Sequence, residues 1–169
     1  MKNFLKWFGV AIAVVLLGIV AFLTSMRFHD GPIEIFSGGP FTSGELSSTP
    51  EDWRYLKDRE TIEFQTMDPS TSRVVWLATY EGRLFIISGY MTTGYGKMWK
   101  KWPHYLDADD RVILRIDGKL YEQRLERIME GLEVLPVLQE FGRKYGMQVD
   151  SSEVVTAGHA WMYEVVERN

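Results

Sequence analysis

The sequence predicts an α+β protein in which one N-terminal transmembrane helix precedes a single small domain of antiparallel strands. Three observations predict this class. An uncharged apolar stretch lies near the N-terminus, tight turns join pairs of strand-like segments, and the helices among them are short. Hairpin-linked strands with short flanking helices are typical of a small barrel or an α+β sheet rather than a doubly wound parallel fold.

Residues 1–29 are predicted to form a membrane anchor. Between Lys6 and Arg27 about 20 residues carry no charge, enough at ~1.5 Å per residue to span ~30 Å of bilayer hydrocarbon. A cleaved signal peptide is the alternative, although the stretch is longer than a typical signal core. Lys2 and Lys6 before the stretch, against Arg27 after it, favour a single-pass protein with a cytoplasmic N-terminus and the domain outside.

Residues 30–48 are rich in Gly, Pro and Ser, so we predict a linker there and a folded domain over 49–169. Thr49-Pro50 followed by acids is typical of a helix start and predicts a short helix to about Lys57. Roughly 110 to 130 residues remain for folding, the usual size of one domain.

Six segments have strand character, and the turns Glu81-Gly82 and Asp117-Gly118 join four of them into two hairpins. The predicted strands are 61–67, 73–80, 83–88, 111–116, 119–128 and 160–166. A short helix over 95–102 is expected to stop at Pro103. A second helix over 132–145 is expected to end at Gly146 and to begin or kink near Pro136.

Composition excludes several function classes. Lys2 and Lys6 are the only charges before Arg27, so the domain is more acidic than the overall net charge of −4. We expect no nucleic-acid partner, because phosphate neutralisation needs a basic face. The chain has no cysteine, and His104 and His159 lack partners at metal-ligand spacing, so no metal site is predicted. No catalytic motif identifies a nucleophile, acid or base.

Two segments could bind an anion. In the first, Arg73 follows Ser70-Thr71-Ser72 at the head of an apolar strand, where a guanidinium and hydroxyls could hold a phosphate or carboxylate. The more common explanation of such residues is a polar turn whose arginine pairs with a nearby acid.

In the second segment, a strand runs through Thr92, Thr93 and two glycines into a predicted helix bearing lysines. Glycine permits close approach of the backbone, and a helix start offers free N–H groups. The lysines are Lys97, Lys100 and Lys101. Alternatively they form a solvated face or pair with the acids at 107–110, and Trp99 and Trp102 are core residues rather than a ring-stacking site.

Together the two segments resemble the flavin-binding split β-barrel superfamily, which includes the pyridoxamine-phosphate oxidases and the deazaflavin-dependent nitroreductases. STSRVVWLATYEGRLFIISG is similar to that family's second and third strands, and GYGKMWKKWPHYLDADDRVILRIDGKLYEQRLERI to its next helix and hairpin. The resemblance implies a split β-barrel and a homodimer. It also implies FMN or a deazaflavin bound through Arg73 and Lys97, with Thr92, Thr93 and Lys101 as further contacts.

The sequence departs from the family pattern where Trp102-Pro103-His104 interrupts the helix and acids replace an Asn-Pro turn. Two functions therefore stay open. One is a membrane-anchored flavin-type oxidoreductase whose cofactor carries the hydride chemistry. The other is a split barrel without any cofactor, acting as a non-catalytic subunit of a membrane complex or as a small-ligand-binding module.

Overall fold

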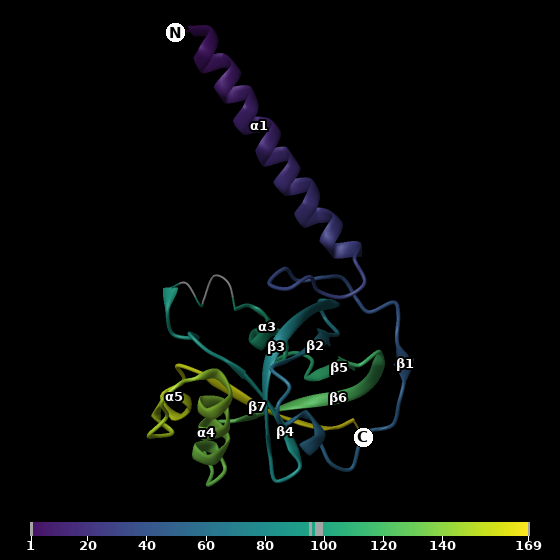
Figure 1. Ribbon diagram of the computed structural model, residues 1–169, viewed down its shortest axis with the longest axis vertical. Helices are drawn as coiled ribbons and strands as arrows, with labels where there is room; N and C mark the ends of the chain where they lie inside the picture. Colours follow the sequence, from purple (N-terminus) through teal and green to yellow (C-terminus); the bar gives the residue numbers. More distant parts are fainter. Residues whose placement is uncertain (1, 95, 97–99, 169) are drawn as a thin grey trace.

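The computed structural model describes residues 2–94, 96 and 100–168 (Figure 1). Helix α1 (Lys2–Ser25) projects away from the rest of the chain and continues into a short 3-10 turn, η1 (Met26–Phe28). The stretch Asn3–Phe28 is long and apolar enough to cross a membrane, and its most apolar window is entirely exposed. A signal sequence has the same properties, so membrane anchoring remains a prediction.

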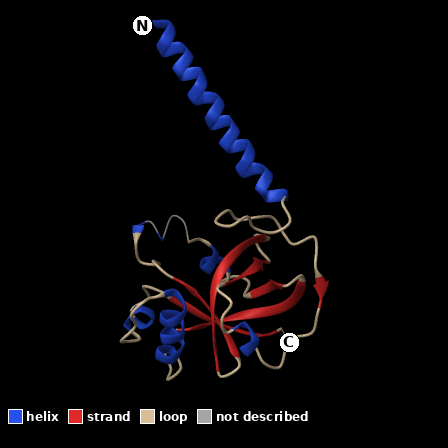
Figure 2. Cartoon of the chain, in the orientation of Figure 1, coloured by secondary structure: helices blue, strands red, loops and turns tan. Residues whose placement is uncertain are grey.

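Six antiparallel strands form a closed barrel (Figure 2). Its strands run in the order β6-β5-β2-β3-β4-β7, and pairing of β7 with β6 closes it. The strands are β2 (Thr61–Thr66), β3 (Thr71–Tyr80), β4 (Arg83–Ser88), β5 (Arg111–Ile116), β6 (Lys119–Ile128) and β7 (Trp161–Glu167). The predicted α+β class and barrel are therefore confirmed.

Two long strands, β3 and β6, change partners along their length. The first part of β3 pairs with β2, and the part from Leu77 onward pairs with β4. Likewise β6 pairs with β5 over its first half and with β7 over its second half. The free edge at the start of β6 takes up β1 (Glu45–Leu46), a parallel strand that the sequence did not predict. These partner changes bend the sheet into a closed barrel.

The alternation of strand side chains creates two cores. Inside the barrel lie Phe64, Leu77, Ile86, Leu114 and their neighbours, all buried. On the outer face, Phe85 and Met162 are covered by α4 (Val134–Tyr145) and by α5 (Glu153–Thr156), a short helix that was not predicted. Helix α4 ends at Gly146 as expected, with φ +70° at that glycine.

The helix predicted over 49–57 is wrong. Only a 3-10 turn, η2 (Arg54–Leu56), forms there. Tertiary hydrogen bonds take the groups that would have started a helix: the Trp53 N–H donates to the Gly82 carbonyl at 2.9 Å, and the Thr49 hydroxyl accepts from Gln123 Nε2 at 2.6 Å. Burial of the Trp53 ring in the barrel core outweighs the local capping signal.

The role predicted for Pro103 is also wrong. It lies in the first turn of α3 (Trp102–Tyr105) instead of stopping a helix, a position where the missing proline N–H costs nothing. Half of the helix predicted over 95–102 falls on residues 95 and 97–99, which lie outside the described residues.

The segment 30–48, predicted as a linker, packs against the barrel. Gly38 forms an antiparallel bridge with Ser72, and the buried Ser72 hydroxyl donates to the Gly39 carbonyl at 2.6 Å. Further along, the Phe41 N–H donates to Gln65 Oε1 at 2.6 Å. The glycines permit this because the two backbones nearly touch: a Cβ on Gly38 would lie 1.8 Å from the Gly31 carbonyl oxygen.

Candidate functional site

Arg73 lies at one end of the barrel, on its inner face. Register pairs Arg73 on β3 with Phe64 on β2, so their side chains point to the same face. Phe64 is fully buried and packs edge-to-face against Trp102 of α3, with ring centroids 4.9 Å apart. The guanidinium is therefore held next to a barrel end that α3 covers.

The charge of Arg73 is poorly compensated. Its Nε is buried without a hydrogen-bond partner, and its Nη2 donates only a long 3.3 Å bond to the Thr71 hydroxyl. Arg73 forms no ion pair with any described residue. Burial lowers the pKa of Arg73 to about 10, against a smaller opposing effect of Tyr105. A desolvated guanidinium with a vacant N–H is typical of a site that binds an anion.

Lys100 is the second cation of this site. It is half-buried and precedes α3. Burial lowers its pKa, and the nearby charge of Arg73 lowers it further. Two neighbouring positive charges in a partly desolvated site repel each other, and each also loses hydration. An anion bound between them would offset both the repulsion and the desolvation. We refer to Arg73 and Lys100 as the cation pair.

Two of the acids after α3 pair with arginines outside the cation pair. Asp109 makes a bidentate pair with Arg111, with a shortest N···O distance of 2.6 Å. Asp110 pairs with Arg124 on β6, also at 2.6 Å. These two carboxylates thus bind the arginines of the next hairpin, and no ion pair among the described residues joins them to a lysine.

The other residues predicted to contact the cofactor do not share the buried, unpaired state of Arg73 where the structure describes them. The Thr93 hydroxyl donates to the Tyr90 carbonyl at 2.8 Å and accepts from the Gly96 N–H at 2.9 Å. The Thr92 hydroxyl lies 2.6 Å from His159 Nδ1. Lys101 is exposed, and Lys97 lies outside the described residues. Roles for these four residues in cofactor binding stay predictions.

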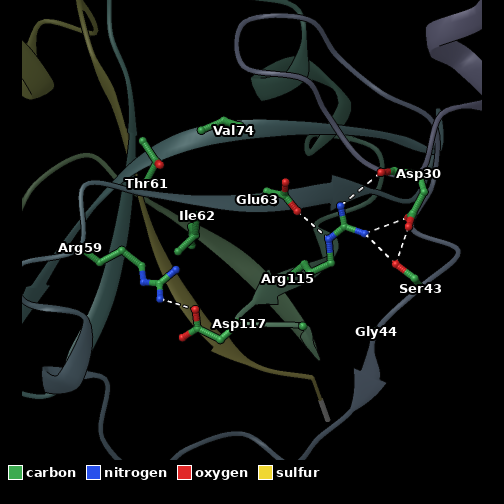
Figure 3. Close-up of a pocket in the computed structure, with 11 residues that line it drawn as sticks. Asp30, Ser43, Gly44, Arg59, Thr61, Ile62, Glu63, Val74, Arg115 and Asp117 are labelled. Carbon is green, nitrogen blue, oxygen red and sulfur yellow. Dashed lines mark hydrogen bonds and ion pairs between the residues drawn. The ribbon is translucent and has the colours of Figure 1, made fainter.

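A separate groove of about 680 Å³ lies on the outer face of the barrel, over β2 and β5 (Figure 3). Its charges compensate one another. Arg115 bonds Asp30 at 2.8 Å and Glu63 at 2.6 Å, and Arg59 pairs with Asp117 at 2.5 Å. The groove therefore has little free charge to offer a ligand.

Histidines of the described chain are likewise engaged locally. His104 Nδ1 lies 3.8 Å from a carboxylate oxygen of Asp107, and the His104 ring packs edge-on against the Trp161 ring. The Arg127 guanidinium also contacts Trp161 and lies 3.6 Å from its ring centroid. Within the described residues no three His, Asp or Glu side chains are grouped as metal ligands would be.

Sequence reasoning found Arg73 but not Lys100 as its partner. The three lysines lie within five residues and look equivalent in one dimension, so no signal in the chain separates them. The effect of the Arg73 charge on the pKa of Lys100 is what identifies Lys100 in the structure.

Comparisons with known proteins concern the fold. No protein-family profile and no curated protein matches the chain. An F420 reductase is 14% identical with a TM-score of 0.42, covering 72% of this chain and 97% of its own. A conserved hypothetical protein from Mycobacterium tuberculosis is 17% identical with a TM-score of 0.48, covering 68% and 77%. A pyridoxamine 5'-phosphate oxidase-like protein from Listeria innocua is 9% identical with a TM-score of 0.46, covering 68% and 88%.

Two of these three, the F420 reductase and the pyridoxamine 5'-phosphate oxidase-like protein, have names that belong to the classes the sequence resemblance named. The predicted barrel fold is confirmed by the closed six-stranded barrel itself and not by these similarities. At TM-scores below 0.5, the similarities do not identify what this chain binds.

Proposed function

We propose that this protein is a membrane-anchored split barrel that binds the phosphate of a flavin-type cofactor, FMN or a deazaflavin, and acts as an oxidoreductase. The single observation that supports cofactor binding most directly is the cation pair. Arg73 carries a buried Nε without a partner, and Lys100 beside it has a lowered pKa. A phosphate would satisfy both charges at once.

The residues of the barrel end fit such a group. Arg73 and Lys100 would hold its phosphate, and the aromatic side chains of Tyr105 and Trp102, which pack on the barrel core, would keep water from the anion. When bound, the flavin or deazaflavin would supply the hydride chemistry, so the chain needs no acid or base of its own. A homodimer remains an expectation from the resemblance, as does the membrane as partner.

The alternative function is a non-catalytic split barrel that is either a subunit of a membrane complex or a small-ligand-binding module of one. Two observations favour keeping it. The predicted hydroxyl donors Thr92 and Thr93 both have partners within the chain, and a groove of about 680 Å³ lies elsewhere, beside Arg115. A module that binds a small anion would also use the cation pair, but only the oxidoreductase requires a chromophore.

The experiment compares ligand stabilisation of the full chain in detergent with that of two variants. Arg73→Met removes the desolvated charge and keeps an apolar side chain of similar length. Arg111→Met is the matched control, because that guanidinium is more than half exposed and pairs with the adjacent Asp109. FMN, coenzyme F420 and inorganic phosphate are each added before thermal unfolding, and the visible spectrum of the purified protein is recorded.

We expect FMN or F420 at ~100 times its Kd to stabilise the wild type by about 2.7 kcal/mol, which raises Tm by roughly 10 °C. The control should respond equally and Arg73→Met not at all. A response to phosphate alone, with no flavin spectrum and no turnover of a reductant, supports the non-catalytic alternative. Equal stabilisation of Arg73→Met and wild type contradicts cofactor binding at the cation pair, and the oxidoreductase proposal with it.

A further inference from the structure

A tight apolar turn lies directly beside the end of α1. The backbones of Ile33 and Phe36 exchange two hydrogen bonds of 3.1 and 2.8 Å, which closes a two-residue turn over Glu34 and Ile35. Glu34 adopts φ +48°, a conformation that such a turn requires. The side chains at its tip face outward: Ile35 is 76% exposed, and Phe28 just before the turn is 85% exposed. We call residues 33–36 the apolar turn.

The apolar turn contacts the candidate membrane span itself. The Phe36 ring packs edge-on against Phe22 of α1, with centroids 5.2 Å apart and planes at 87°. Arg27 is the first charge after the apolar stretch, and Phe22 precedes it by a rise of only about 8 Å. A side chain that touches Phe22 therefore lies at the boundary between hydrocarbon and headgroups if α1 spans the bilayer.

The base of the apolar turn is fixed to the barrel rather than free. Gly31 and Pro32 are buried, and Asp30 is bonded by Arg115 of β5 at 2.8 Å. Gly38 and Gly39, on the return path, bond Ser72 of β3. The apolar turn is thus held on both sides by bonds to the barrel, on one side to β5 and on the other to β3.

We propose that the apolar turn, together with Phe28, inserts into the lipid interface beside α1 and holds the barrel at a defined orientation to the bilayer. The inference rests on the membrane anchoring included in the proposed function. Apolar side chains in the interface gain about 25 cal/mol per Å² of area removed from water, and the Glu34 carboxylate at the tip stays hydrated among headgroups. One helix alone fixes position but permits rotation, whereas two adjacent contacts restrict it.

Because the chain contains no cysteine, a single introduced cysteine can be labelled specifically, and the test uses this. Ile35→Cys, Val14→Cys and Leu132→Cys are each labelled with an environment-sensitive fluorophore in the full chain and reconstituted into phosphatidylcholine vesicles. Leu132 is the matched control, since it is 97% exposed and precedes α4, remote from α1 in Figure 1. Lipids that carry a quencher high or low on the acyl chain report depth.

We expect the label at position 35 to lose most of its emission with the shallow quencher, that at 14 with the deep quencher, and that at 132 with neither. If position 14 is quenched but 35 behaves like 132, the inference fails while anchoring stands. If position 14 is not quenched, anchoring fails and the inference with it. A blue shift at 35 that depends on protein concentration, without lipid quenching, would place a second copy there and overturn it.

Discussion

Two partly buried arginines of this protein lie in opposite electrostatic situations. Arg115 on β5 is bonded by Asp30 and Glu63, and its guanidinium lies 4.3 Å from the Phe41 ring centroid. Arg73 on β3 has one long hydrogen bond and no ion pair among the described residues. A paired buried charge holds structure together, whereas an uncompensated one is costly unless a ligand completes it. This contrast is why we assign a structural role to Arg115 and a binding role to Arg73.

The Asp30 carboxylate should make the stability of the protein depend on pH in the acidic range. Burial alone would raise its pKa, but hydrogen bonds from the Ser43 hydroxyl and the Thr42 N–H, with Arg115, lower the pKa to about 2. The stabilisation is therefore complete above the ordinary pKa of 3.8 and is lost as pH falls toward 2. We expect Asp30→Asn to lower the free energy of unfolding by about 1 to 2 kcal/mol at pH 7 and by almost nothing near pH 2.

Urea unfolding of the full chain in detergent at both pH values measures this difference. Asp58→Asn is the control, because Asp58 is 86% exposed and 3.6 Å from Arg143, so it should change stability by less than ~0.5 kcal/mol at either pH. A pH-independent loss for Asp30→Asn would contradict the assignment.

At the scale of elements, the segment 30–48 behaves as a packed strap rather than a flexible connection. Its glycines are used for close backbone contact: a Cβ on Gly38 would clash with Gly31, and one on Gly39 would lie 2.3 Å from the Arg27 carbonyl oxygen. At Gly31 the backbone has φ +82° and a Cβ would lie 1.9 Å from Arg115. Glycine thus serves here for packing, although the same composition is typical of linkers.

Gly38→Ala should therefore destabilise the protein. The added methyl meets backbone atoms that cannot rotate away, so the strap must shift or detach, at a cost of about 2 to 4 kcal/mol. Gly89→Ala is the control, since nothing lies within 4 Å of its Cβ position, and it should be neutral or slightly stabilising. Hydrogen exchange of residues 30–48 distinguishes the outcomes: unchanged protection in Gly38→Ala would show that the strap is not held by this contact.

For the whole molecule, charge predicts orientation in the membrane. Lys2 and Lys6 precede the apolar stretch, and Arg27 follows it, a bias that favours a cytoplasmic N-terminus. The barrel after it carries the excess of acids, which does not oppose translocation because acidic residues contribute little to topology. A domain outside the cytoplasm would meet little free flavin nucleotide, so topology also bears on the oxidoreductase proposal.

We expect added protease to digest the domain in right-side-out vesicles and to leave it intact in inverted ones. N-terminal sequencing of the membrane form should begin at the start of the chain if α1 is an anchor. A mature N-terminus after α1 would instead identify a cleaved signal peptide. If the domain is digested only in inverted vesicles, the orientation is the opposite of the one predicted.

Local signals in the sequence determined most of the architecture. Alternating apolar residues and the turns at Glu81-Gly82 and Asp117-Gly118 predicted strands that coincide closely with β3 to β6, because hairpin turns and side-chain period are properties of adjacent residues. The uncharged stretch before Arg27 likewise predicted α1. At the site, Arg73 stood out because it opens an apolar strand.

Tertiary structure alone decided the features that depend on distant contacts. It replaced the helix expected over 49–57 with a turn, because Trp53 is buried and its N–H is taken by Gly82. It docked residues 30–48 against β3 and β5, and it brought Lys100 close enough to Arg73 for the two charges to interact. Each of these outcomes joins residues that are far apart in the chain. A local sequence pattern does not show which distant residue will bond a free N–H, pack against a glycine or lie beside a buried charge.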